Sequence, residues 1–427
     1  MERMMIISSD GHVAPKMRSY REYIDPDMRA EFDDFCDDHD KNGSGHTAEG
    51  RALKMFIDED VADEWDRTQG DTGRIDGMWD SDRRLEVLEG EGVCAEVLIP
   101  ESAGLPFRLH QAAVLREKRI QGPSAAQIQA GDRAYNRWLA DFVSTTPERY
   151  AGMAHIQFEP VAAAVEEIKR AKENGLKGVM IPTFDAERPL FIAEFDPIWS
   201  ALEDTGLPLC SHAAMSLTSN FGFNYAGLPH PGCAGPISRA TSVAFCQWIL
   251  DHMVWGGVFE RHPRLRVVFT EQSSGWIPGK LTTMDYSYTG SYLRQDIKSV
   301  IKHSPSEYFR RQCWIGSSLL AASEVEARHL IGVDKMMVGT DYPHFEGSWN
   351  GGNIDYLQAT FGPADVPVEE ARLMLGETIV EVYDFDVAKL RPIAERIGPL
   401  PERILTPPVE DKFPRGDVHK PLGGFSL

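Results

Sequence analysis

Histidines and carboxylates stand directly after several short apolar runs of this sequence, where they could bind a metal. The residues concerned are Asp10, His12, Glu101, His212, Glu271, Asp341 and His344. Imidazole nitrogens and carboxylate oxygens are common ligands of divalent metal ions. Four of these residues are carboxylates, and burying them together without a cation would carry a large desolvation and repulsion cost. We therefore predict a site for one or two divalent ions, with iron, zinc or manganese as candidates.

The elements that must position these residues are eight short apolar runs separated by amphipathic segments. The runs cover residues 4–9, 95–100, 150–158, 178–182, 207–211, 265–270, 313–317 and 336–340. Most are continuously apolar, as expected of parallel strands that are buried on both faces. Helical patterns between them cover residues 160–174, 195–203, 238–261 and 368–382. Eight alternating repeats predict an α/β fold, the (β/α)8 or TIM barrel.

Such a barrel would gather the candidate ligands at one rim, because active sites of these barrels lie at the C-terminal ends of the strands. Asp10 and His12 are two residues apart at the end of the first strand, so their side chains share a face. The second, fifth, sixth and eighth strands end in Glu101, His212, Glu271 and Asp341, and His344 follows shortly after. The joint arrangement predicts a metal centre more strongly than any one of these residues does.

The chain of 427 residues is long for a minimal barrel, and three stretches do not fit one. We assign residues 1–387 to the barrel, including an insertion at 16–90 that packs over the mouth and a Gly/Pro/aromatic loop at 214–237. Phe221, Phe223 and Tyr225 in that loop indicate either a lid over an apolar pocket or an ordinary interface loop. Residues 388–427 are Pro-rich and predict an extended C-terminal tail. We expect a homo-oligomer, with this tail against a neighbouring subunit.

Composition excludes several classes of partner. The net charge of −21 offers no basic surface for nucleic acid, and no apolar run is long enough to span a membrane. The six cysteines form no CxxC pair and predict reduced, buried thiols. The N-terminus has no pattern of a signal peptide, so the cytoplasm is the expected location. The expected partner is a small-molecule substrate.

Four motifs carry a resemblance to a known family. They are SSDGHV at 8–13, SHA at 211–213, VFERHPRLRVVFTEQSSGW at 258–276 and GTDYPH at 339–344. In order and spacing the chain resembles the amidohydrolase superfamily over residues 4–385, in the branch of the aminocarboxymuconate-semialdehyde decarboxylase-like proteins. Members commonly use His-x-His on strand one, a histidine each on strands five and six, and an aspartate on strand eight.

The sequence departs from that pattern at two ligand positions. Asp10 replaces the first histidine of His-x-His, and Glu271 replaces the histidine of strand six. No lysine ends the fourth strand where a carbamylated bridge would be expected. A site this rich in oxygen favours iron or manganese over zinc, relative to the site with histidines at these positions.

Three reactions are open to such a site. The first is hydrolysis by metal-activated water, with Asp341 as general base and His344 as the other candidate catalytic residue. The second is oxygenation by two irons, as in a non-heme monooxygenase. The third is non-oxidative decarboxylation, which is frequent in the branch that the sequence resembles. The sequence alone favours hydrolysis of a small, fairly hydrophobic carbonyl or carboxylate compound.

Three further histidines are less easily assigned. His155 lies within the third strand, where it would be either a donor that supports the site or a satisfied core histidine. His110 and His230 lie in loops where they could contact substrate. We do not expect either of the two to be a metal ligand.

Overall fold

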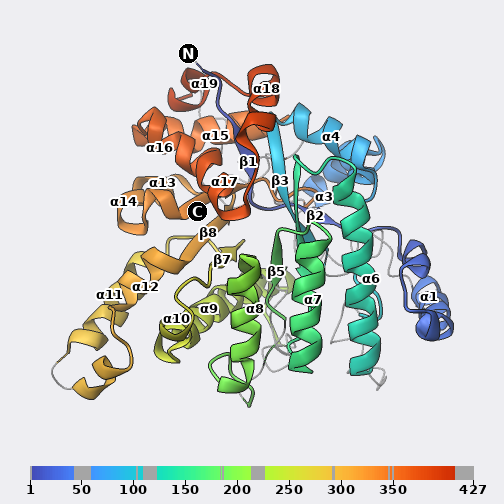
Figure 1. The fold of residues 1–427 in the computed structure, drawn as a ribbon. Helices are drawn as coiled ribbons and strands as arrows, with labels where there is room; N and C mark the ends of the chain where they lie inside the picture. Colours follow the sequence, from blue (N-terminus) through green and yellow to red (C-terminus); the bar gives the residue numbers. More distant parts are fainter. Residues whose placement is uncertain are drawn as a thin grey trace.

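Parallel strands form the centre of the molecule in the computed structural model (Figure 1). The structure describes residues 2–42, 59–101, 104–108, 123–182, 184, 187–212, 227–290, 294–344, 347–348 and 351–408. The strands are β1 (Ile6–Ser8), β2 (His12–Val13), β3 (Val93–Pro100), β4 (Tyr150–His155), β5 (Gly178–Met180), β6 (Leu209–His212), β7 (Val267–Thr270), β8 (Cys313–Ser318) and β9 (Met336–Gly339). Each of the eight predicted strands is present, and the short β2 is an addition.

The eight main strands pair in the order β1-β3-β4-β5-β6-β7-β8-β9, and every pairing is parallel. Hydrogen bonds bring the first and last strands together. The Ser9 N–H donates to the Val338 carbonyl at 2.8 Å, and the Asp341 N–H donates to the Asp10 carbonyl at 3.0 Å. A parallel bridge joins Gly11 to Tyr342. The predicted (β/α)8 barrel is confirmed.

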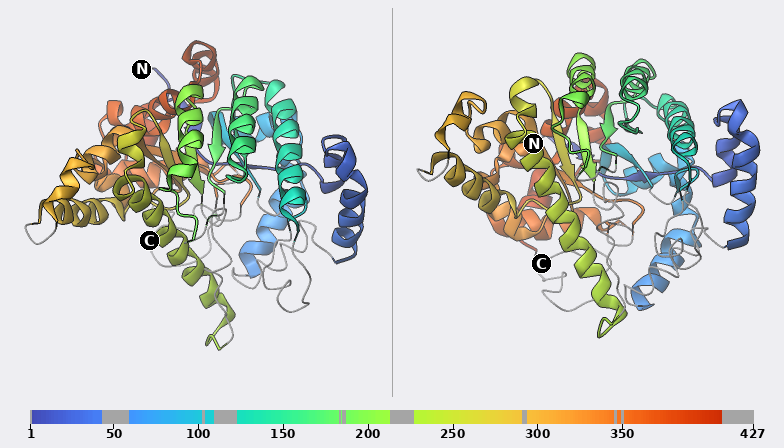
Figure 2. Two further views of the ribbon diagram at one scale, coloured as in Figure 1. Left: turned by 60° about the horizontal axis from the view of Figure 1, so that its bottom comes forward. Right: turned by 90° about the horizontal axis from the view of Figure 1, so that it is seen from below.

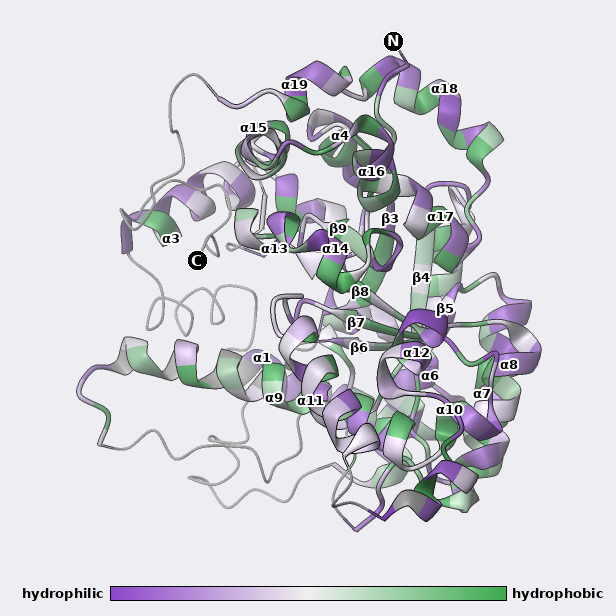
Figure 3. Ribbon diagram, turned by 90° about the vertical axis from the view of Figure 1, so that its left-hand side faces the viewer, coloured by the Kyte–Doolittle hydropathy of each residue, from purple (hydrophilic) through white to green (hydrophobic). Residues whose placement is uncertain are grey.

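Side chains on each strand alternate between the barrel interior and the surrounding helices. On β4, Ala151 and Met153 belong to an interior apolar cluster that also contains Met180 and Cys210 of β5 and β6. Ala154 belongs instead to the layer between the barrel and its helices. Because both layers are apolar, the strands appear in sequence as continuous hydrophobic runs. Figure 3 shows the contrast with outer helices, which carry hydrophilic and hydrophobic residues side by side.

The helices surround the barrel in chain order. They are α1 (Arg29–Asn42), α3 (Glu59–Trp65), α4 (Ser81–Gly90), α6 (Ala125–Ser144), α7 (Val161–Glu173), α8 (Asp196–Thr205), α9 (Ala234–Trp255), α10 (Val258–Arg261), α11 (Ile277–Thr289), α12 (Pro305–Gln312), α13 (Ala322–Glu326), α14 (Arg328–Ile331), α15 (Asn353–Phe361), α16 (Val368–Arg372), α17 (Thr378–Tyr383), α18 (Val387–Ile397) and α19 (Pro401–Leu405). Helix α7 matches its prediction and is followed by Gly175 at a φ of 80°, as its sequence indicates. Figure 2 shows the long α9 projecting away from the barrel.

The helix predicted over residues 238–261 is divided in two. Helix α9 ends at Trp255, and α10 begins at Val258. Gly256 lies so close to Phe191 that an added Cβ would be 2.1 Å from the Phe191 Cβ, and Gly257 has a φ of 71°. A close approach and a left-handed residue, both of which suit glycine, therefore interrupt the helical pattern.

Part of the predicted C-terminal extension is helical and covers the N-terminal end of the barrel. Leu390 and Ala394 of α18 join the interior apolar cluster with Met5 and Ile7. The Met4 N–H donates to the Pro399 carbonyl at 2.9 Å. Figure 1 shows the N-terminus beside α18 and α19. The described end of the chain therefore packs on its own barrel.

The insertion and the loop after β6 are described only in part. Helices α1, α3 and α4 lie within the predicted insertion at 16–90, and residues 43–58 are outside the described residues. The same holds for His110 and for Phe221, Phe223 and Tyr225 of the predicted lid. Among the described helices, we find none whose length and apolar character would allow it to cross a membrane.

Candidate metal centre

The ends of β1 and β9 are joined by a network that fixes two of the candidate ligands. The Ser8 hydroxyl donates to the Asp10 carbonyl at 2.6 Å and lies 3.0 Å from the Thr340 hydroxyl. The Thr340 N–H donates back to the Ser8 hydroxyl at 3.0 Å. The Ser318 hydroxyl, from β8, donates to the Asp10 carboxylate. The side chain of Asp10 is therefore oriented by a hydroxyl from β8, two strands from β1 in the barrel, and its carbonyl is held by Ser8.

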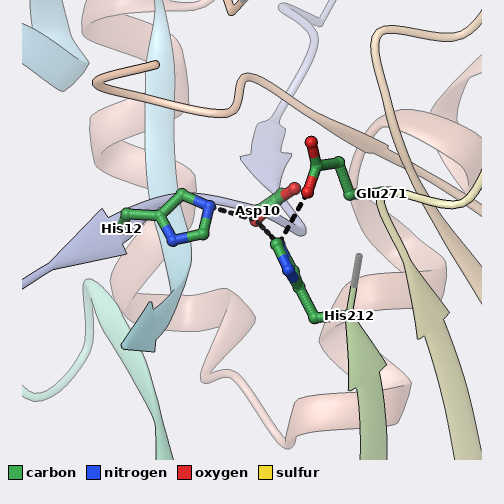
Figure 4. Close-up of side chains that lie close together, drawn as sticks. All are labelled: Asp10, His12, His212 and Glu271. Atoms are coloured by element: carbon green, nitrogen blue, oxygen red, sulfur yellow. Dashed lines mark ion pairs between the residues drawn. The ribbon is translucent and has the colours of Figure 1, made fainter. Parts of the chain in front are cut away.

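Four of the predicted ligands converge on one point (Figure 4). Nε2 of His212 lies 3.4 Å from Oδ1 of Asp10 and 3.3 Å from Oε2 of Glu271. Nε2 of His12 lies 3.7 Å from the same Asp10 oxygen. One potential ligand atom from each of these four residues lies within 4.8 Å of the other three. This spacing could place all four around a single ion.

A second group shares His12. His12, Asp341 and His344 also offer ligand atoms within 4.8 Å of one another. Nε2 of His12 is 3.3 Å, and Nδ1 of His344 is 2.9 Å, from Oδ1 of Asp341. Glu101 touches this group from outside, with Oε2 at 2.9 Å from Nε2 of His344. The structure thus brings all seven predicted residues to one rim, with Glu101 at its edge.

Two of the carboxylates project from strained backbone. Glu271 directly follows β7 and Asp341 lies two residues after β9, and both have a φ of 55°. This left-handed conformation is unusual for a residue other than glycine and costs of order 1–3 kcal/mol at each position. The Glu271 N–H donates to the Gly316 carbonyl at 2.9 Å, which helps to hold the turn. Such strain concentrates where a side chain must be aimed at a functional site.

The charges within the site perturb one another. Burial lowers the pKa of His12, and the neighbouring His344 lowers it further. Burial opposes ionisation of Asp341, but His344 and His12 together hold its pKa well below the ordinary value. Burial also opposes protonation of His344, and Asp341 and Glu101 overcome this to raise its pKa. His12 is therefore a neutral imidazole that could bind a metal, and Asp341 is a carboxylate.

Several buried polar atoms of the site suit a cation. Asp10, His12 and Asp341 are at most 2% exposed. Oδ1 of Asp10, both nitrogens of His12 and both oxygens of Asp341 have no hydrogen bond of good geometry within the described part of the chain. Leaving such groups unsatisfied costs roughly 1–3 kcal/mol each, and more where they are charged. A divalent cation would satisfy these oxygens and a nitrogen of His12 together.

A fully buried ion pair between α4 and β3 contacts the backbone of the candidate ligand His12. Arg84 of α4 contacts Glu96 of β3 at 2.6 Å, and both side chains are 0% exposed. Nη1 of Arg84 also donates to the His12 carbonyl at 2.7 Å. A Cβ on Gly11 would lie 2.0 Å from Oε1 of Glu96. Glycine is therefore required between the two candidate ligands Asp10 and His12.

Sequence reasoning missed this pair, although one signal was available. Glu96 is the only charged residue in the strand VCAEVLIP at 93–100. A carboxylate inside an otherwise apolar strand must find a buried partner. That Arg84 is this partner could not be predicted from sequence, because it depends on how the insertion at 16–90 packs. His230, in its loop, accepts a hydrogen bond from the Gly232 N–H at 3.0 Å and belongs to neither ligand group.

Comparison with known proteins places these features in a family. The amidohydrolase family model matches residues 97–385. A gamma-resorcylate decarboxylase from Rhodococcus jostii (strain RHA1) is 26% identical over 280 residues, which cover 61% of this chain and 79% of that protein. A 2-amino-3-carboxymuconate-6-semialdehyde decarboxylase from Dictyostelium discoideum is 24% identical over 277 residues, covering 62% and 67%.

A solved structure shows the same fold. It is a dihydroxybenzoic acid decarboxylase from Polaromonas sp. JS666 with bound manganese and the inhibitor 2-nitroresorcinol. It is 16% identical, has a TM-score of 0.57, and the match covers 91% of this chain and 99% of that one. The family match spans more than half of the sequence and includes the strands that carry His212, Glu271 and Asp341. The predicted resemblance is confirmed: this chain belongs to the amidohydrolase family.

Proposed function

We propose that this chain is a metal-dependent, non-oxidative decarboxylase of a small hydroxylated aromatic or unsaturated carboxylate. The observation that carries the proposal is that the three proteins compared above are all named as decarboxylases, and two of them match over about three-fifths of this chain. The same relatives support an enzymatic role. The sequence alone favours hydrolysis, but these relatives favour decarboxylation over it.

Four deeply buried residues would hold the metal. The side chains of Asp10, His12, His212 and Asp341 are 0–3% exposed, and the first three form a ligand group with Glu271. We propose manganese, because the site is rich in carboxylates and the solved dihydroxybenzoic acid decarboxylase contains it. When bound, such a cation would hold the substrate carboxylate and an adjacent oxygen and withdraw electron density from them.

The remaining residues face the place where substrate must lie. Glu101, Glu271 and His344 have side-chain exposures of 13%, 16% and 28%, well above those of the buried four. His344 is the most exposed of the seven and contacts carboxylates through both ring nitrogens. An imidazole in that position can carry a proton between the carboxylates and a bound substrate.

Decarboxylation requires one proton at the reacting carbon. The bond between that carbon and the carboxylate breaks, its electron pair stays on the carbon, and carbon dioxide leaves. We assign delivery of the proton to His344, which Glu101 and Asp341 hold in place. A hydroxyl beside the carboxylate would help the ring accept the proton, so hydroxylated substrates are the preferred class.

One observation favours a second candidate, oxygenation by two irons. The two ligand groups share His12 and together offer five further side chains: Asp10, His212, Glu271, Asp341 and His344. Mixed histidine and carboxylate ligands of this kind suit iron as well as manganese. Elemental analysis of protein purified without added metal separates the two. Two irons per chain with oxygen consumption would favour the oxygenase.

The test of the proposal is carbon dioxide release from a small panel of carboxylates. Protein loaded with manganese is incubated with 2,6-dihydroxybenzoate, 5-carboxyvanillate and the isomer 3,5-dihydroxybenzoate, which has no hydroxyl beside the carboxylate. We expect release from at least one of the first two compounds and none from the third. Esters and lactones serve as hydrolysis substrates. Hydrolysis of these without any release of carbon dioxide would overturn the proposal.

A further inference from the structure

A second buried polar network lies at the end of β4, outside both ligand groups. Nδ1 of His155 is 3.1 Å from Oδ1 of Asp132, which projects from α6. Nη2 of Arg108 lies 2.7 Å from the same oxygen, and Nε2 of Gln157 donates to the other oxygen at 2.7 Å. His155 is 0% and Asp132 3% exposed. The carboxylate is therefore fully engaged and fixes one side of the imidazole.

The backbone of His155 is held equally firmly. Nδ2 of Asn136 donates to the His155 carbonyl at 2.9 Å, and the His155 N–H donates to Oδ1 of Asn136 at 2.8 Å. Asn136 is one turn after Asp132 on α6, so a single helix orients both the backbone and the ring. This network leaves the ring little freedom to rotate, a degree of control that a residue filling space does not need.

The contacts determine which ring nitrogen carries the hydrogen. An ionised carboxylate only accepts, so the short contact with Asp132 requires a hydrogen on Nδ1 of His155. Arg108 is 3.4 Å from Nδ1, and its Nη2 already donates to Asp132 at the shorter distance. Burial lowers the pKa of His155, Asp132 opposes this, and Arg108 reinforces it. The ring is neutral, and Nε2 is a hydrogen-bond acceptor.

That acceptor has no partner in the described part of the chain. Nε2 of His155 is buried and makes no hydrogen bond to any described residue. An acceptor left in this state costs roughly 1–3 kcal/mol. Because Nδ1 and Nε2 lie on opposite sides of the ring, fixing Nδ1 against Asp132 directs Nε2 away from α6. The cost and the direction both indicate a hydrogen-bond donor that binds from outside the network.

The fold places this acceptor on the mouth side of the barrel. Ala151 and Met153 on β4 face the interior, and His155 continues the same alternation at the strand end. It pairs in register with Met180, which also faces the interior. β4 lies two strands from β1 and two from β6 in the barrel order, so His155 lies on the rim between the strands that carry His12 and His212.

We propose that Nε2 of His155 accepts a hydrogen bond from a hydroxyl group of the substrate at the β4 side of the barrel mouth. The proposal rests on the proposed function only for the choice of a hydroxylated carboxylate as substrate. Asp132 acts through His155 and is a positioning residue. The site would select compounds that carry a hydroxyl donor at this place over ethers that do not, because an ether leaves the buried acceptor unpaired.

The test compares two coloured ligands that differ in a single hydroxyl. The probes are 2-nitroresorcinol and its monomethyl ether, which keeps one hydroxyl for the metal and loses the other as a donor. Each is titrated into the manganese-loaded chain and followed by visible absorbance. Losing one hydrogen bond and leaving its acceptor buried should weaken binding about 10- to 100-fold. We expect the original protein to prefer the resorcinol by that factor.

Variants then connect the preference to His155. His155→Asn keeps an amide N–H where Nδ1 lies, so Asp132 stays paired, but it removes the acceptor. We expect the preference to fall to about 2-fold or less while manganese content and the circular dichroism spectrum stay unchanged. Asp132→Ala removes the acceptor for Nδ1–H, so it should also reduce the preference. His329→Asn, on the exposed face of α14, is the matched control.

The outcomes separate this proposal from the proposed function. An unchanged preference in folded, manganese-loaded His155→Asn protein would overturn the role of His155, even if carbon dioxide is released. Absence of any preference in the original protein would overturn it as well. If the preference depends on His155 but the protein releases no carbon dioxide, the hydroxyl site is supported. In that case only the decarboxylase proposal fails.

Discussion

Gly11→Ala is the most direct test of how the fold supports the metal centre. The added Cβ would lie 2.0 Å from Oε1 and 2.5 Å from Cδ of Glu96, and 2.7 Å from Nη2 of Arg84. Glu96 cannot move aside into solvent, because it and Arg84 are both 0% exposed. One member of the pair must therefore lose its partner or the end of β1 must shift.

The size of the effect follows from these two outcomes. Breaking a buried ion pair by displacing one partner costs about 3–5 kcal/mol, which is a factor of roughly 150 to 5,000 in the folding equilibrium. If the strand end shifts instead, the stability loss is smaller, but Asp10 and His12 move away from their partners. The variant should then bind less than half as much manganese as the original protein under the same conditions.

Chemical unfolding followed by tryptophan fluorescence and circular dichroism measures the first effect, and elemental analysis after desalting measures the second. Gly90→Ala is the matched control, because it lies at the end of the helix that carries Arg84 and a Cβ there meets no atom within 4 Å. We expect that control to retain both stability and metal. A Gly11→Ala protein with the stability and the metal content of the original would refute the reasoning.

Four further outcomes are expected. Chelation should lower the free energy of unfolding by about 2.7 kcal/mol relative to protein at a free metal concentration 100 times Kd; unfolding curves that coincide with and without metal would contradict a bound cation. Asp341→Ala should abolish turnover in a folded protein, and activity near that of the original would contradict its role. His344→Asn should lower kcat at least 100-fold with manganese retained; an effect confined to KM would argue against proton delivery. Burial raises the pKa of Glu96 from 4.5 to about 7, so the folded chain binds a proton that the unfolded chain releases, and stability should fall as pH rises across that window. In metal-free Glu96→Gln protein, the free energy of unfolding should no longer fall with pH across this window. An equal pH dependence in the metal-free original protein and the variant would contradict the assignment to Glu96.

The strands and the order of the candidate ligands could be predicted from sequence because both follow local rules. Apolar runs such as residues 265–270 keep their pattern whatever surrounds them, and closure of eight parallel strands brings their ends to one rim. His212 and Glu271 therefore meet without any further information. The metal-binding role of these residues remains a prediction, and the reaction remains a proposal.

What sequence could not provide depends on contacts between distant segments. Arg84 reaches Glu96 because α4 packs against β3, and no periodicity links positions 84 and 96. Likewise, Asp132 meets His155 because α6 crosses the end of β4. The break before α10 was foreshadowed by Gly256 and Gly257, but the approach of Phe191 that requires it is a tertiary contact.

Closure of the barrel between its first and last strands determines when the barrel can be completed during synthesis of the chain. β1 ends at Ser8 and receives its partner β9 only when residues 336–339 have been synthesised. At about 5–20 residues per second, that is a wait of roughly 15 to 70 seconds on the ribosome. Throughout that interval the apolar strand β1 has one unpaired edge, and α18 is not yet present to pack against Met5 and Ile7. Asp10 and His12 meet Asp341 only at the end of this interval, so the metal centre cannot form before residue 341 has been synthesised.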